Sequence, residues 1–377
     1  MSRRLLLLPL CAFLASCGGG VSPSAPPPAP PRPPRELTGL EPFAPRTEIR
    51  VGQRIGPLIA YGNYDDGTTG TVDVAWTSSD PAVVTIDEED FAEGVGVGMA
   101  VLTATFEGFS VALEFTVEDP NPRSTRDRPD DIGGPQIHFV YAVPSDREDL
   151  NRDRFGEIGY SVAAMQNWLH DQTGRRLRVD TYEGRVDVSF LRLSFTHQEG
   201  DGFGASLVEH LMREASRLAI RGDKVLGIYY EGWAIGVCGS ALFQRGGAHY
   251  IDCNSLPRVG VDEHTFNAPE ATMLHELFHV FGAVPQCAPN EGRYFHVIDE
   301  PNDLMYAGEG RVDLRPEERA LAVDVGRDDY YGHGRPDCVD VSRSRFLEPA
   351  PGVAAGSRTM EVRLPAGDWP LRCELEH

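Results

Sequence analysis

The sequence predicts a multidomain protein in which an all-β sandwich precedes an α/β domain built on a mixed, twisted sheet. Three observations lead to this fold class. The chain has 377 residues, which favours two folded domains over one. Residues 37–118 alternate apolar and polar side chains with the period of a strand, whereas beyond residue 136 such runs alternate with amphipathic helical patterns. Residues 119–135 are polar and rich in Pro and Asp, and are predicted to be a linker.

The N-terminal residues 1–16 are predicted to be a signal peptide, because Arg3 and Arg4 precede an apolar run too short to span a membrane. The run ends in Leu14-Ala15-Ser16-Cys17, which resembles the lipobox of bacterial lipoproteins. This resemblance implies cleavage before Cys17 and lipidation of that cysteine; the alternative is an ordinary signal peptide cut nearby. Residues 17–36 are then a Pro-rich tether. We expect a protein of the cell envelope, lipid-anchored to a bacterial outer membrane, or an extracellular protein.

The formal net charge of −22 argues against nucleic acid or anionic lipid as the main partner, because both are bound through basic patches. Contact with a membrane is therefore expected only through the N-terminal lipid. A monomer is expected.

Residues 37–118 are predicted to be all-β, with turn-forming residues at 65–67 and 79–81. Apolar side chains alternate in three runs: Val72, Val74 and Trp76; Ala100, Leu102, Ala104 and Phe106; Val111, Leu113, Phe115 and Val117. The segments Trp76-Thr-Ser-Ser-Asp-Pro81, Val84-Thr-Ile86 and Gly98-x-Ala100-x-Leu102-Thr103-Ala104 resemble the group 2 bacterial immunoglobulin-like domain. The resemblance implies a spacer or an adhesion unit, and we favour a spacer because no cluster of reactive side chains lies here.

Residues 136–345 are expected to form the second domain. The predicted strands are 137–143, 177–182, 186–195, 225–230 and one around 249–251, with 225–230 at the centre of the sheet. The predicted helices are 155–173, 203–221, 271–282 and a short one at 316–325. Residues 346–377 are expected to add an accessory strand or hairpin. Asp328 and Asp329, in a polar loop, are candidate ligands of a structural calcium ion, although a solvated loop is the simpler interpretation.

One short motif, His275-Glu276-x-x-His279 followed by Gly282, lies in the predicted helix 271–282. Residues four apart share one face of a helix, so both imidazoles can reach one metal ion, and Glu276 can touch a water on that ion. The helix is apolar almost all round, and a bound metal would compensate its buried polar side chains. The competing interpretation is a chance match, with two hydrogen-bonded core histidines. Gly282 and then Pro285 end the helix abruptly.

A second motif, Asp303-Leu-Met305-Tyr306, places its methionine 23 residues after Gly282. The two motifs together resemble the metzincin clan of zinc peptidases. The resemblance implies one catalytic zinc ion, a protein or peptide substrate, Glu276 as general base and Met305 as the methionine of the Met-turn beneath the zinc. Tyr294 or Tyr306 as an oxyanion donor is less favoured than a core or rim role, because the clan's tyrosine lies two residues after the methionine.

One departure from the clan concerns the third zinc ligand, whose position is taken by Pro285. Catalytic zinc needs three protein ligands, so another donor is required. His296 is the first candidate, because a neutral imidazole is a common zinc ligand and a lengthened loop would return there. Asp299 is the second. Glu300, with Asp303 three residues on, is the third, by similarity to the Glu-x-x-Asp pattern of thermolysin-like peptidases.

The sequence contains seven cysteines, of which Cys11 is lost with the leader and Cys17 is acylated. The other five lie beyond residue 237, and in an oxidising compartment they are expected to form disulfides. We favour Cys238–Cys253 and Cys287–Cys338, with Cys373 left over; sequence alone does not fix the connectivity.

These expectations combine into a lipid-anchored, extracytoplasmic zinc metalloendopeptidase. Two alternatives stay open at this point. One is an inactive peptidase fold that serves adhesion or binding, and the other is a zinc hydrolase of a non-peptide bond such as a glycosidic or ester bond.

Overall fold

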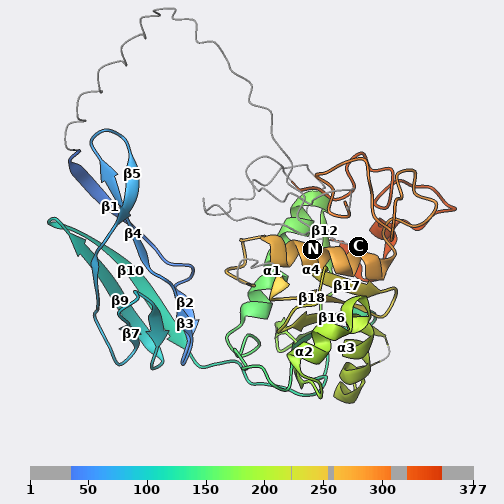
Figure 1. The fold of residues 1–377 in the computed structure, drawn as a ribbon, viewed down its shortest axis with the longest axis horizontal. Coiled ribbons are helices and arrows are strands. Elements are labelled where there is room, and N and C mark those ends of the chain that lie inside the picture. The colour runs from blue at the N-terminus through green and yellow to red at the C-terminus, as the bar shows by residue number, and fades with distance from the viewer. Residues whose placement is uncertain (1–34, 222, 254–258, 307–320, 350–377) are drawn as a thin grey trace, which may run out of the picture.

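The computed structural model describes residues 35–221, 223–253, 259–306 and 321–349 (Figure 1). The predicted signal peptide, Cys17, Cys373 and almost all of 346–377 lie outside these residues. The described chain is built of several sheets and is mostly β, with few helices. None of the helices in these ranges is long and apolar enough to cross a membrane.

Residues 37–118 form three small sheets, drawn in blue to teal in Figure 1. Their orders are β1-β4-β5, β2-β10-β9-β6 and β3-β8-β7. The strands are β1 (Leu37–Phe43), β2 (Glu48–Arg50), β3 (Arg54–Ile55), β4 (Ile59–Tyr64), β5 (Thr69–Val72), β6 (Ala75–Ser78), β7 (Val84–Ile86), β8 (Ala92–Gly94), β9 (Gly98–Phe106) and β10 (Phe109–Glu118). The described pairings are antiparallel except that of β2 with β10.

The alternation of apolar and polar residues predicts burial in β9 correctly, but it does not predict where β5 ends and β6 begins. Ala100, Leu102 and Ala104 of β9 are buried, as their period of two requires. The run from Val72 to Trp76 is instead divided between β5 and β6. The reason is that β5 pairs with β4, whereas β6 pairs with β9 in another sheet.

A five-stranded sheet of order β15-β11-β16-β18-β17 organises the rest of the chain. Its strands are β11 (Gln136–Val143), β15 (Val188–Arg192), β16 (Lys224–Tyr230), β17 (Gly239–Leu242) and β18 (Gly246–Tyr250). Every described pairing in it is parallel except that of the edge strand β17 with β18. β16 is central, as predicted, and β11 is buried along its whole length, which is typical of a strand covered on both faces.

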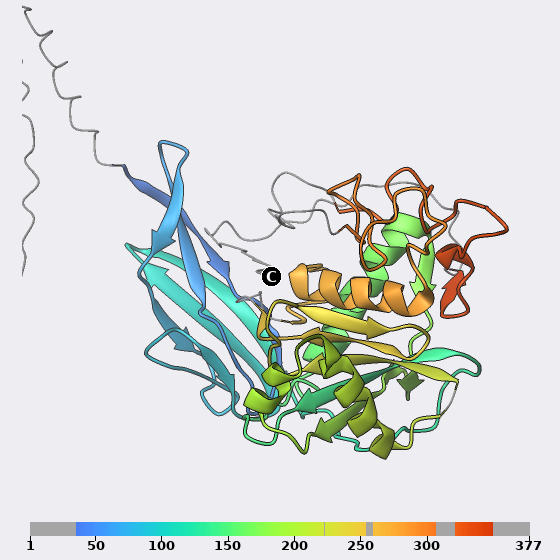
Figure 2. The same cartoon turned by 45° about the vertical axis from the view of Figure 1, so that its right-hand side comes forward.

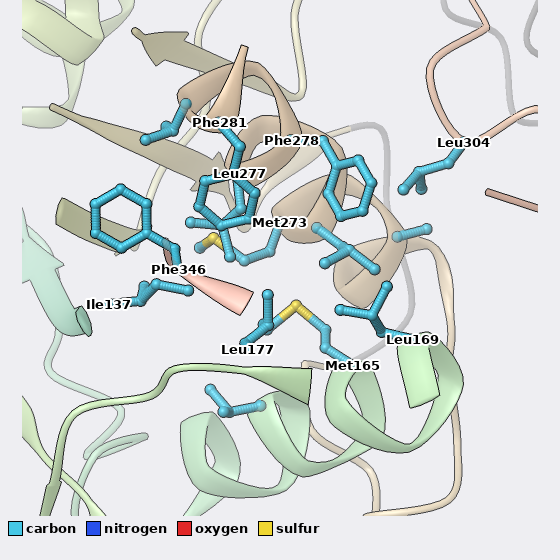
Figure 3. Packing of buried hydrophobic residues seen from close by; sticks show 14 of the residues in the cluster. Ile137, Met165, Leu169, Leu177, Met273, Leu277, Phe278, Phe281, Leu304 and Phe346 are labelled. Atoms are coloured by element: carbon cyan, nitrogen blue, oxygen red, sulfur yellow. The ribbon is translucent and has the colours of Figure 1, made fainter. Parts of the chain in front are cut away.

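Helices cover both faces of this sheet (Figure 2). α1 (Glu157–Thr173) and α4 (Ala268–Phe281) pack into one core on one face, and α3 (Leu207–Ala215) packs into a second core on the other. Figure 3 shows Met165 and Leu169 of α1 beside Met273, Leu277 and Phe278 of α4. The helix that carries the His-Glu-x-x-His motif therefore packs against both α1 and the sheet.

Several predicted boundaries are wrong, for local reasons. The predicted strand 177–182 is two short strands, β12 (Arg175–Leu177) and β13 (Thr181–Tyr182), because Asp180 between them turns inward to bind His138. The predicted strand 186–195 divides into β14 (Arg185–Val186) and β15.

The predicted helices also differ in extent. Helix 203–221 shortens to α3, flanked by 3₁₀ turns at Gly204–Ser206 and Ser216–Leu218 and preceded by α2 (His197–Gly202). Residues 321–325 of the predicted helix 316–325 are not helical, because the Asp324 carboxylate accepts hydrogen bonds from the backbone N–H groups that follow it and fixes a turn; residues 316–320 lie outside the described ranges.

Residues 119–135, predicted as a linker, are packed against the sheet. Arg123 pairs with Asp149 and Asp153, and Lys224 of β16 donates to Asp127 Oδ1 at 2.6 Å and to Asp130 Oδ1 at 2.9 Å. At the other end of the domain, β19 (Leu347–Pro349) pairs with β12.

Candidate metal centre

α4 has strong start and stop signals. The Glu270 carboxylate accepts from the backbone N–H of the N-cap residue Asn267 at 3.2 Å, and Pro269 lies in the first turn, where proline is tolerated. Gly282 ends the helix with φ 90°, in the left-handed region that glycine adopts without strain. The helix therefore includes both His275 and His279, which lie one turn apart on it.

The structure brings His275, His279 and His296 together. Their Nε2 atoms are 3.0 Å (His275–His296), 3.1 Å (His275–His279) and 3.2 Å (His279–His296) apart. His275 Nδ1 lies 2.7 Å from the Leu304 carbonyl oxygen, and His296 Nδ1 lies 3.1 Å from that of Arg293. Each of these Nδ1–H groups donates to its carbonyl, which leaves Nε2 with a free lone pair.

Three imidazole lone pairs at this separation repel one another unless a cation lies among them. Burial lowers the pKa of His275 to about 3, and it lowers the pKa of His279 and of His296 as well, so the rings are neutral. Zinc held tetrahedrally by nitrogens at about 2.0–2.1 Å would place them about 3.3 Å apart. The donor set and its spacing therefore fit a zinc ion.

The other candidates for the third ligand lie apart from this group. Asp299 and Glu300 are exposed, and neither belongs to the group of donor atoms that the three histidines form. Tyr294 is 80% exposed and Tyr306 is half-buried. Among the sequence candidates in the described ranges, only His296 joins the helical pair.

Glu276, on the same helix, is 6% exposed, and burial raises the pKa of its carboxyl to about 8. The carboxylate lies against the edge of the sheet, beside Gly239 of β17. Within the described residues its oxygens have no protein hydrogen-bond partner, so the group is available to a water or a substrate.

Met305 is fully buried in a turn that supports two of the three histidines. Leu304 accepts from His275, and the Met305 carbonyl accepts from the backbone N–H of Val297, one residue after His296. Asp303 holds the turn: its Oδ1 accepts from the Met305 backbone N–H at 2.7 Å and from the Tyr330 hydroxyl at 2.8 Å. Burial raises the pKa of Asp303 to about 6. Tyr330 was not predicted from the sequence, in which it stands in a polar, Gly-rich loop.

Both favoured disulfides are confirmed. Cys238–Cys253 joins the start of β17 to the residues after β18, with a Cα–Cα distance of 5.1 Å. Cys287–Cys338 ties the loop between α4 and His296 to the C-terminal segment, with a Cα–Cα distance of 5.8 Å.

Two further groups of side chains that could hold a metal ion lie elsewhere in the described residues. Asp127, His138, Asp180 and Asp187 are clustered, but the Lys224 ammonium and the Arg128 guanidinium already supply positive charge there. The other group is Asp324, Asp328 and Asp329. Asp324 accepts from backbone N–H groups and Asp329 from Asn290, so these carboxylates hold turns; calcium there stays a prediction.

Comparisons with known proteins do not identify the chain. No family model and no curated protein matches it. A solved structure described as a bacterial Ig-like domain containing GH10 xylanase from termite gut aligns at 10% identity over 62% of this chain, with a TM-score of 0.14. This chain spans 58% of the length of that one. A TM-score this low carries no argument about fold or function, so a functional assignment depends on the site itself.

Proposed function

We propose that this protein is a zinc-dependent endopeptidase with a metzincin-like catalytic domain. The single observation that supports it best is the convergence of three neutral imidazoles, His275, His279 and His296, with their Nε2 atoms 3.0–3.2 Å apart. The Glu276 carboxylate on the same helix supplies the base that hydrolysis of an amide needs. The Met305 turn beside His275 is the second element shared with the clan.

Bound zinc supplies Lewis-acid activation of the attacking water and of the scissile carbonyl. Glu276 accepts the proton of that water as the new C–O bond forms, and it then donates the proton to the leaving nitrogen as the C–N bond breaks. The carbonyls of Leu304 and Arg293 keep His275 and His296 in the tautomer that presents Nε2.

The N-terminal part of the chain would determine where this activity takes place. We propose that residues 37–118 are an immunoglobulin-like spacer, and that lipidation at Cys17 anchors the protein in the cell envelope. The mature enzyme would then act on proteins or peptides outside the cytoplasm.

Metal content and peptide hydrolysis, measured on the same samples, test the proposal. The wild type should contain one equivalent of zinc and cleave casein, and a chelator should abolish cleavage. Glu276→Gln should keep the zinc and lose activity by about 10³-fold or more, because it keeps the volume of the side chain and loses the base.

The third ligand is tested by a matched pair. His296→Ala should lose most of the zinc, whereas Asp299→Ala, three residues away and exposed, should keep a full equivalent. A full equivalent in His296→Ala, or undiminished turnover in Glu276→Gln, would refute the assignment. Zinc retention together with hydrolysis of esters or glycans but not of peptides would show that the bond is of another class.

A further inference from the structure

Two glycines, one on the edge strand β17 and one on its neighbour β18, face Glu276. A β-carbon built on Gly239 of β17 would lie 2.5 Å from Glu276 Oε1, 2.7 Å from its Cγ and 2.8 Å from the Ala248 carbonyl oxygen. A β-carbon built on Gly247 of β18 would lie 2.7 Å from the Glu276 Cβ and 3.0 Å from its carbonyl carbon. Carbon atoms do not approach this closely without repulsion, so a side chain at either position would displace Glu276 or the strand.

Space rather than backbone conformation requires glycine at these two positions. Neither Gly239 nor Gly247 has a φ in the left-handed region, so alanine could adopt either backbone conformation. Their roles differ. Gly247 meets the backbone and Cβ of Glu276 and so sets the distance between α4 and the sheet, whereas Gly239 meets the carboxylate itself.

The strand beside the carboxylate is fixed in place. Cys238, directly before Gly239, is bonded to Cys253, and its carbonyl accepts from the Tyr250 backbone N–H at 2.8 Å. Gly239 pairs with His249 of β18 in the antiparallel ladder. With β17 held at its first residue, a bulkier side chain at 239 would move the Glu276 carboxylate rather than the strand.

We propose that Gly239 is a positioning residue for Glu276: together with Gly247 and the Cys238–Cys253 disulfide it forms a slot that fixes where the carboxylate lies. This inference rests on the proposed function only in that Glu276 is taken as the base. Side chains at position 239 would then impair proton transfer while leaving the three histidines able to bind metal.

The first experiment measures kinetics and zinc content of Gly239→Ala. The variant should keep one equivalent of zinc and a KM near that of the wild type, while kcat falls about 100-fold, as expected for a catalytic group displaced by about 1 Å. Undiminished kcat with full zinc would overturn the inference. A wild type without peptidase activity would instead contradict the proposed function. The steric contact between position 239 and Glu276 would then be tested by the second experiment.

The second experiment is independent of activity. Glu276→Ala removes the Oε1 and Cγ atoms that a β-carbon at 239 would meet, and leaves the Ala248 carbonyl oxygen as the remaining close contact. Gly239→Ala should therefore lower the Tm by about 5 °C in the wild-type background and by less in the Glu276→Ala background, where only the contact with the Ala248 carbonyl oxygen remains. Equal losses of Tm in the two backgrounds would contradict the inference that a side chain at position 239 meets the Glu276 side chain.

A control on the neighbouring strand β18 excludes a general sensitivity of the sheet to added side chains. A β-carbon on Gly246 would face the opposite side, toward Met212 and the Leu226 carbonyl oxygen at 2.6 Å. Gly246→Ala should thus lower the Tm equally in both backgrounds. Should Gly239→Ala fail to fold, the double variant decides: its folding with bound zinc supports the slot, and its failure refutes it.

Discussion

Replacing Tyr330 with phenylalanine removes one hydroxyl beneath the metal centre and leaves the packing of the ring unchanged. This hydroxyl donates to Asp303 Oδ1 at 2.8 Å and accepts from the Asp324 backbone N–H at 2.8 Å, and the side chain is fully buried. Loss of a hydrogen bond to a charged group costs about 1.5–3 kcal/mol, and a stranded buried N–H costs about 1–3 kcal/mol. We expect Tyr330→Phe to lower the free energy of unfolding by about 3–5 kcal/mol.

Urea unfolding of the zinc-loaded protein near pH 7.5 measures this change, and Tyr331→Phe is the matched control. Tyr331 is also buried, and its hydroxyl interacts with the Thr173 side chain, so its loss should cost only about 1 kcal/mol. Tyr330→Phe should still bind one equivalent of zinc, because no histidine loses a contact. If the two variants are equally stable, the hydroxyl does not support the Met305 turn and the reasoning is wrong.

Three further predictions concern stability. A chelator should lower the Tm by about 5–10 °C, reversibly on adding zinc at about 100 times its Kd, and an unchanged Tm would show that the folded state binds no metal. On the chain-entropy model, removing Cys287–Cys338, which closes 51 residues, should cost about 4 kcal/mol in denaturant unfolding, against about 3 kcal/mol for Cys238–Cys253, which closes 15; the reverse order would contradict it. Burial raises the pKa of Glu270 from 4.5 to about 7, so the folded state keeps a proton that the unfolded state releases. The stability from this proton is complete below pH 4.5 and is lost as pH rises toward 7, by about 1.4 kcal/mol per unit. The stability of the wild type relative to Glu270→Gln should therefore fall across this window, and a flat difference would disprove the shift.

The parts of the site that depend on local geometry could be predicted from the sequence. Residues four apart on a helix share a face, and Gly282 marks its end, so the pair His275 and His279 follows from spacing alone. The third histidine, which comes from the loop after the helix, does not follow from spacing. His296, Asp299 and Glu300 lie within five residues of one another, and only the fold of that loop turns His296 inward and leaves the two carboxylates exposed.

Long-range ionic contacts account for much of what the sequence did not predict. Asp180 interrupts a predicted strand because it faces His138 and Lys224, which are 42 and 44 residues away along the chain. Apolar periodicity indicates which side chains are buried, but it carries no information about which charges meet. For the same reason the sequence indicates that Asp303 belongs to a motif and Tyr330 to a polar loop, but not that their side chains are hydrogen-bonded.

The packing of residues 119–135 has a practical consequence for dividing the chain. A recombinant fragment that starts at Gln136 would lack Asp127 and Asp130, and would leave the ammonium group of Lys224 in the interior with Asp180 as its remaining anion. Removing partners of a buried ion costs about 3–5 kcal/mol, a large share of the stability of a typical domain. The smallest autonomous unit around the metal centre must therefore include Asp127 and Asp130, which lie inside the segment 119–135 that composition alone marks as a linker.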